Sequence, residues 1–170
     1  REAPRDAGWR GKIIAGLAHI LQSEDKPRGL RGQAMAALAL SGDPGAAGFF
    51  RQALQSISFE LIPLAALGSG VIRDGKAVEL LSTTMSAPSI SARRAVCLAL
   101  VAIGSPAALE AVAHTLLSGD EDLRRAAAEA LANDPGEGYA MLKDGATLKD
   151  ILVRRSTVYG LMRVDEPWAT

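Results

Sequence analysis

Apolar residues recur along the chain at intervals of three and four, the spacing that places side chains on one face of an α-helix. The clearest block runs from Leu123 to Leu131 and consists of alanines and charged residues between two leucines. Related blocks recur, and each can be aligned on its final leucine. These anchors are Leu38, Leu67, Leu100, Leu131 and Leu161. Successive anchors lie 29 to 33 residues apart. Self-similarity at this nearly constant spacing predicts a helical repeat array.

Positions before each anchor also keep their character. The residue directly before the anchor is small in all copies: Ala37, Ala66, Ala99, Ala130 and Gly160. The residue eight positions before it is apolar in all copies: Leu30, Phe59, Ala92, Leu123 and Val153. These offsets trace one helical face, so each block predicts the second, or B, helix of a hairpin.

Between the blocks lie Gly, Asp and Pro residues, followed by further apolar residues at helical spacing. Gly42-Asp43-Pro44 and Gly104-Ser105-Pro106 are examples, and proline near a helix start after a glycine stop is the expected order. These segments predict a first, or A, helix in each hairpin. We therefore expect ten helices in five pairs, over about 9–41, 43–72, 74–104, 105–133 and 135–164, in a right-handed α-α superhelix within one domain of residues 1–170.

The block from Leu123 to Leu131, and residues 89–118 through Arg93-Arg94-Ala95-Val96 and Ala99-Leu100, resemble the short HEAT repeat. This short type is also found in phycobilisome-lyase-like proteins. The resemblance implies an α solenoid of about five HEAT-like hairpins whose B helices line a concave surface. It also implies that arginines seven positions before the anchors, such as Arg93 and Arg124, tie neighbouring repeats together through acids such as Asp120 and Asp150.

Positions six and two before each anchor point away from the apolar face and would line that surface. They predict a groove that is apolar in its N-terminal half and basic in its C-terminal half, where a row of arginines suits an acidic segment of a partner protein. A solvated basic face is the alternative. The predicted groove residues are Leu61, Arg94, Leu98, Arg125, Glu129, Arg155, Tyr159 and Arg163.

Pro63 falls inside the second predicted B helix, at a core position. Proline lacks a backbone N–H and crowds the preceding turn, so this helix either begins near Pro63 or is kinked there.

Charge and composition narrow the classes of partner. Lys plus Arg and Asp plus Glu number 19 each, and this zero net charge argues against general binding to nucleic acid or anionic membrane. No run of about 18 apolar residues predicts a membrane span. Cys97 has no partner for a disulfide and is expected to be a small buried hydrophobe. The sequence does not determine the cellular compartment, and the cytoplasm is the default expectation. Because the chain opens with Arg1 and residues 165–168 look like a new helix start, we expect a piece of a longer repeat protein.

Residues that could carry chemistry do not converge. His19 and His114 lie in different A helices, and no His, Cys or carboxylate spacing marks a metal or catalytic site. We therefore predict a scaffold for protein binding, with no cofactor. The alternative is an enzyme on the same fold, similar to bilin lyases or helical-repeat DNA glycosylases. Tyr159 beside Arg155 and Arg163 comes nearest to the aromatic residue on a basic face that such a glycosylase would need. Self-association through the end repeats, which carry Trp9 and Trp168, is a further expectation.

Overall fold

The computed structural model describes residues 5–23, 25–56 and 60–169. Within these ranges the chain forms ten α-helices and no strand, which confirms the predicted α solenoid of helical hairpins. The helices are α1 (Arg5–Gln22), α2 (Arg28–Ser41), α3 (Ala47–Leu54), α4 (Ile62–Val71), α5 (Val78–Thr84), α6 (Ile90–Ile103), α7 (Pro106–Ser118), α8 (Glu121–Leu131), α9 (Glu137–Thr147) and α10 (Ile151–Leu161). Single 3₁₀ turns at Pro44–Ala46, Gly75–Ala77 and Pro167–Ala169 complete these elements.

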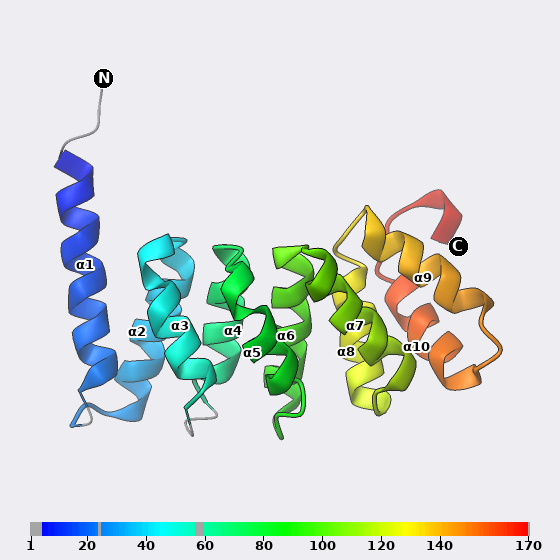
Figure 1. Cartoon of the computed structure of the whole chain (residues 1–170), viewed down its shortest axis with the longest axis horizontal. Helices are drawn as coiled ribbons and strands as arrows, with labels where there is room; N and C mark the ends of the chain where they lie inside the picture. Colours follow the sequence, from blue (N-terminus) through cyan, green and yellow to red (C-terminus); the bar gives the residue numbers. More distant parts are fainter. Residues whose placement is uncertain (1–4, 24, 57–59, 170) are drawn as a thin grey trace.

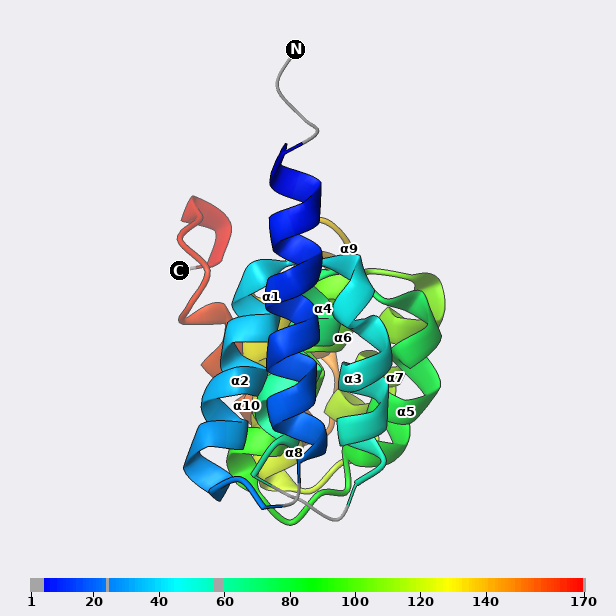
Figure 2. The same ribbon diagram turned by 90° about the vertical axis from the view of Figure 1, so that its left-hand side faces the viewer.

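The helices stack into two layers, with the described ends of the chain at opposite ends of the array (Figure 1). The A helices α3, α5, α7 and α9 form one layer, and the B helices α2, α4, α6, α8 and α10 form the other. Figure 2 looks along the array and shows α2, α8 and α10 on the side opposite α3, α5 and α7. Every hairpin therefore buries its apolar faces against its neighbours along the array.

Short polar side chains set where several helices begin. Ser105 accepts a hydrogen bond from the backbone N–H of Ala108 at 3.3 Å, and Pro106 occupies the first turn of α7, where it lacks only a donor that would have no helical partner. Asp120 accepts one from the N–H of Leu123 at 2.9 Å at the start of α8. Ser105 thus caps the first helix of its hairpin, and Asp120 caps the second.

Small residues let the B helices approach one another closely. A Cβ atom built on Gly70 of α4 would lie 2.8 Å from the Cα of Ala99 in α6, and one on Gly160 would lie 2.7 Å from the carbonyl oxygen of Ala128. Successive B helices consequently pack along their lengths, whereas successive A helices touch at fewer points. Ala99 and Gly160, the small residues directly before the anchors Leu100 and Leu161, take part in these contacts.

The second repeat departs from the predicted register. Leu67, taken as its anchor, is 40% exposed, whereas Ser69 is fully buried at the position that leucine holds in the neighbouring repeats. Ser69 lies midway in the sequence between Leu38 and Leu100. Helix α4 begins at Ile62 with Pro63 in its first turn, so the beginning of a helix, and not a kink, accommodates this proline. Phe59, which the predicted register placed eight positions before the anchor of this repeat, lies outside the described residues.

This shift of register also corrects one predicted groove residue. Leu61 is 5% exposed and belongs to the core, so its placement on the outward face was wrong. The corrected register puts Pro63 and Leu67 at the two outward positions of the second repeat. The pattern misled because Leu67 follows a small residue, as the true anchors do, whereas the buried position holds a polar serine.

Candidate functional site

The outward side of the B-helix layer is called the B face here. It consists of the positions six before, two before and two after each anchor, in the corrected register. In the N-terminal half its exposed side chains are apolar: Leu40 is 87% exposed, Val71 60% and Leu67 40%. In the C-terminal half six of the nine such positions hold Arg94, Arg125, Glu129, Arg155, Tyr159 and Arg163, and the other three hold Leu98, Ala102 and Asn133. The exposed side chains of the B face therefore change from apolar to mainly charged along the array.

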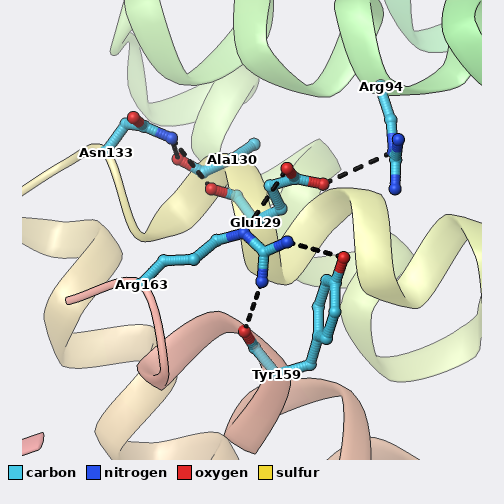
Figure 3. Close-up of polar contacts among 6 residues, drawn as sticks. All are labelled: Arg94, Glu129, Ala130, Asn133, Tyr159 and Arg163. Atoms are coloured by element: carbon cyan, nitrogen blue, oxygen red, sulfur yellow. Dashed lines mark hydrogen bonds and ion pairs between the residues drawn. The ribbon is translucent and has the colours of Figure 1, made fainter.

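Glu129 of α8 joins three successive B helices in the charged half. Its carboxylate lies 3.4 Å from Nε of Arg94 in α6 and 3.4 Å from Nε of Arg163, which follows α10 (Figure 3). The Asn133 side-chain amide donates to the Glu129 carbonyl oxygen at 2.9 Å. Glu129 thus braces the repeat on either side of its own.

Glu121 makes a second bridge of the same kind at the other end of α8. It pairs with Arg125 of its own helix at 2.9 Å and with Arg155 of α10 at 3.1 Å. Its role across repeats depends on how far α10 is rotated against α8, which periodicity alone does not give.

Tyr159 lies between two of the arginines. The Arg163 guanidinium stands 3.9 Å from the ring centre and donates a hydrogen bond to the phenol oxygen at 2.6 Å. Arg125 also approaches this ring, with its guanidinium 5.5 Å from the ring centre. Such contacts hold cations over an aromatic face while leaving their remaining donors in solvent.

The charged half is therefore a network and not a row of independent cations. It contains four arginines against two glutamates, which leaves an excess of two positive charges. The arginines stay accessible, since their side chains are 35% to 55% exposed. Chemically, this surface can still accept carboxylates, though in competition with its own glutamates.

A hollow of about 530 Å³ opens where α4, α6 and the end of α8 meet. Its apolar lining includes Leu67, Val71 and Leu98. Arg73 and Asp134 stand among its polar residues, and the Asp134 carboxylate is already engaged by the backbone N–H groups of Gly136 and Gly138. The hollow borders the charged half through Asn133, which is hydrogen-bonded to the Glu129 carbonyl oxygen. Sequence reasoning missed it because the register error had turned Leu67 inward.

Two of the arginines seven positions before the anchors, Arg93 and Arg124, contact other parts of the array. Arg93 pairs with Asp120, the cap of the next B helix, at 2.9 Å and donates to the carbonyl oxygen of Ala87 at 2.8 Å. The backbone N–H of Leu123 and the Arg93 guanidinium hold the pKa of Asp120 below its ordinary value. Arg124 donates to the Leu117 carbonyl oxygen at 3.2 Å.

Other side chains singled out in the sequence offer little chemistry. Burial raises the pKa of the Cys97 thiol to about 12, which keeps it protonated. Among the residues that the structure describes, no group of His, Cys, Asp and Glu could hold a metal ion. None of the described helices combines the length and apolarity that crossing a bilayer needs.

The two tryptophans at the ends of the array differ. Trp9 of α1 is 71% exposed, whereas Trp168 packs edge-to-face on Tyr139 at 5.4 Å between ring centres and lies under the Lys143 ammonium. Self-association through these ends stays a prediction.

Comparison with known proteins supports the repeat assignment. The family described as HEAT repeats matches residues 61–132, which run from the start of α4 to the end of α8. A crystal structure of an engineered protein superposes with a TM-score of 0.55 at 21% identity, over 89% of this chain and 78% of that one. This likeness shows the fold alone. No curated protein matches the chain significantly. The HEAT-like nature of the repeats is confirmed.

Proposed function

We propose that this array of HEAT-like repeats is a non-catalytic scaffold that binds another protein through its B face. HEAT repeats generally mediate protein interactions, which supports the scaffold role. The close packing of successive B helices, against the looser contacts of the A helices, favours a curve that makes the B face the inner one. An inner face lets one extended partner contact several repeats at once.

The observation that carries this proposal is the charged network across α6, α8 and α10. Arg94, Arg125, Arg155 and Arg163 leave two positive charges unbalanced on one exposed surface. Guanidinium groups bind carboxylates through paired hydrogen bonds, so an acidic segment of a protein is the partner that this surface suits. The two glutamates within the network disfavour a nucleic-acid backbone, whose phosphates would meet them at close range.

A selection from displayed random peptides tests the proposal without a known partner. The peptides enriched on the folded chain should be acidic, and they should lose binding when Arg94, Arg125 and Arg155 are all changed to glutamine. Glutamine is preferable to glutamate here because a new carboxylate would stand beside Glu121 and Glu129 and could destabilise the array. Unaltered capture by this triple variant would contradict the proposal.

The matched control removes the same number of positive charges elsewhere. Arg10, Lys76 and Lys149 are exposed and form no ion pair within the described residues, so changing them to glutamine leaves the B face intact. This control should bind the selected peptides as the parent chain does. If it lost binding equally, general charge attraction and not the B face would account for the capture.

A further inference from the structure

Resting on the proposed function, we infer that the partner segment is a helix with an apolar end and an acidic end, and that it lies across the B face in one direction only. Its apolar half occupies the hollow between α4 and α6, and its acidic half lies over the arginines of α8 and α10. The B face changes character once along its length, from exposed apolar side chains to paired arginines. A partner that covers both halves must change character at the same place.

The hollow fits apolar side chains of a helix. Val71 and Leu67 stand one helical turn apart on α4 and so present one continuous apolar strip, and Leu98 of α6 forms the facing wall. Val71 is 60% exposed, and an apolar side chain seated against it removes that surface from water. Spaced i, i+3, i+4 and i+7, the side chains of a helix enter such a groove together.

The charges around the hollow set the polarity of the partner. Arg73 is exposed at its rim and forms no ion pair within the described chain, and Arg94 continues the positive charge toward α8. The one carboxylate in the lining, Asp134, is held by backbone N–H groups at the start of α9. Acidic residues on the partner are therefore favoured from the rim of the hollow onward.

The dimensions agree with a single helix. Neighbouring packed helices lie roughly 8–10 Å apart, so the distance from α4 to α10 is about 24–30 Å. A helix of about 16–20 residues covers that length at 1.5 Å per residue. About two turns of apolar residues at one end and two or three turns of glutamates at the other would meet both halves of the B face.

The test uses three fluorescein-labelled synthetic helical peptides, each long enough to cover the distance from α4 to α10. The first has leucines at helical spacing in one half and glutamates in the other. The second has the same composition with leucines and glutamates spread evenly. The third carries the glutamates of the first but alanines for its leucines. We expect the first to bind the chain most tightly in fluorescence anisotropy, at least roughly tenfold more tightly than the second.

Two variants locate the apolar half. Val71→Lys places a charge in the hollow and should weaken binding of the first peptide roughly tenfold, without affecting the third. Leu117→Lys is the matched control, because Leu117 is 50% exposed on α7, an A helix, and this change should leave binding unaltered. Both positions are exposed in the folded chain, and thermal unfolding of each variant checks that the fold is retained.

The outcomes separate this inference from the proposed function. One outcome is that all three peptides bind equally, that the arginine-to-glutamine triple variant binds none of them, and that Val71→Lys changes nothing. The proposal of an acidic partner would then be supported, and the inference of a helix with an apolar and an acidic end would be overturned. If none binds, and the displayed-peptide selection also yields no arginine-dependent sequence, both are overturned. Binding of the first peptide that depends on Val71 and the arginines together supports both.

Discussion

Glu129 of α8 stands 3.4 Å from Arg163 beyond α10, and the same carboxylate reaches back to Arg94 of α6. One side chain thus links three repeats across the surface that we propose binds a partner. The arginines consequently have two roles that compete, since each bond to Glu129 is one that a partner's carboxylate must replace. This competition gives the binding surface a signature that a purely structural network would lack.

Replacing Glu129 by glutamine should separate the two roles. The loss of two partly exposed ion pairs should cost about 0.5–1 kcal/mol of unfolding free energy, measured in urea. The same change releases Arg94 and Arg163 from the Glu129 carboxylate, with Arg163 still held by Tyr159. An acidic helical peptide should therefore bind several-fold more tightly than to the parent chain in fluorescence anisotropy. A variant that loses stability with no gain in affinity would identify the network as structural only.

Replacing Ser69 by alanine should stabilise the array. Ser69 is fully buried and its hydroxyl forms no hydrogen bond within the described structure, so removing the hydroxyl should raise the unfolding free energy by about 1 kcal/mol. Ser105→Ala makes the same chemical change at the cap of α7 and should instead lower it by about 1 kcal/mol. The urea midpoints of the two variants should therefore shift in opposite directions. A loss of stability in Ser69→Ala would contradict the claim that the Ser69 hydroxyl is buried without a hydrogen bond.

Replacing Gly160 by alanine should loosen the last repeat. The new Cβ would lie 2.7 Å from the carbonyl oxygen of Ala128, a backbone atom that can move only if α10 shifts against α8. We expect a loss of about 1–3 kcal/mol, seen as a lower melting temperature. Gly32→Ala on α2 meets no atom within 4 Å and should gain up to about 1 kcal/mol from helix propensity. Similar gains in both variants would exclude the close helix contact.

Acid should weaken the link between the third and fourth repeats. The pKa of Asp120 is lower in the folded chain because the Leu123 N–H and Arg93 favour its charged form. Asp120 therefore stabilises the fold above its unfolded pKa of about 3.9, and this contribution is lost as the pH falls through the lower folded value. Asp120→Asn keeps a capping side chain, so its urea midpoint should fall less between pH 6 and pH 3 than that of the parent chain.

Cys97 should report on opening of the array. Its side chain is fully buried and its pKa is raised to about 12 by burial, so the thiol should resist thiol-specific reagents at pH 8 in the native state. In denaturant it should react at the rate of an unstructured cysteine. Rapid native labelling would mean that α6 separates readily from its neighbours.

The sequence predicted the array well where large apolar residues marked the core. Leu38, Leu100 and Leu131 are all fully buried, as their regular spacing indicated. The predicted register of the second repeat was wrong because Ser69 occupies the buried position and Leu67 lies nearby on the outward face. The equal spacing of Leu38, Ser69 and Leu100 was the signal that could have corrected it.

The surface was less predictable than the core. Helical periodicity placed Arg94, Arg125, Arg155 and Tyr159 on one face, but it could not show that Glu121 and Glu129 bridge these residues between repeats. Those contacts depend on the rotation of each B helix against the next, which small residues such as Gly160 determine through close packing. The hollow beside Val71 depends on the same geometry.

Anisotropy of the peptide with one apolar and one acidic half, titrated with the parent chain and with the Arg94, Arg125 and Arg155 to glutamine variant, tests the central claim most directly. The account predicts saturable binding to the parent chain that the triple variant loses while it remains folded, with its melting temperature lowered by no more than the loss of three partly exposed ion pairs accounts for. Equal binding to both chains would contradict the claim that the B face is the interaction surface.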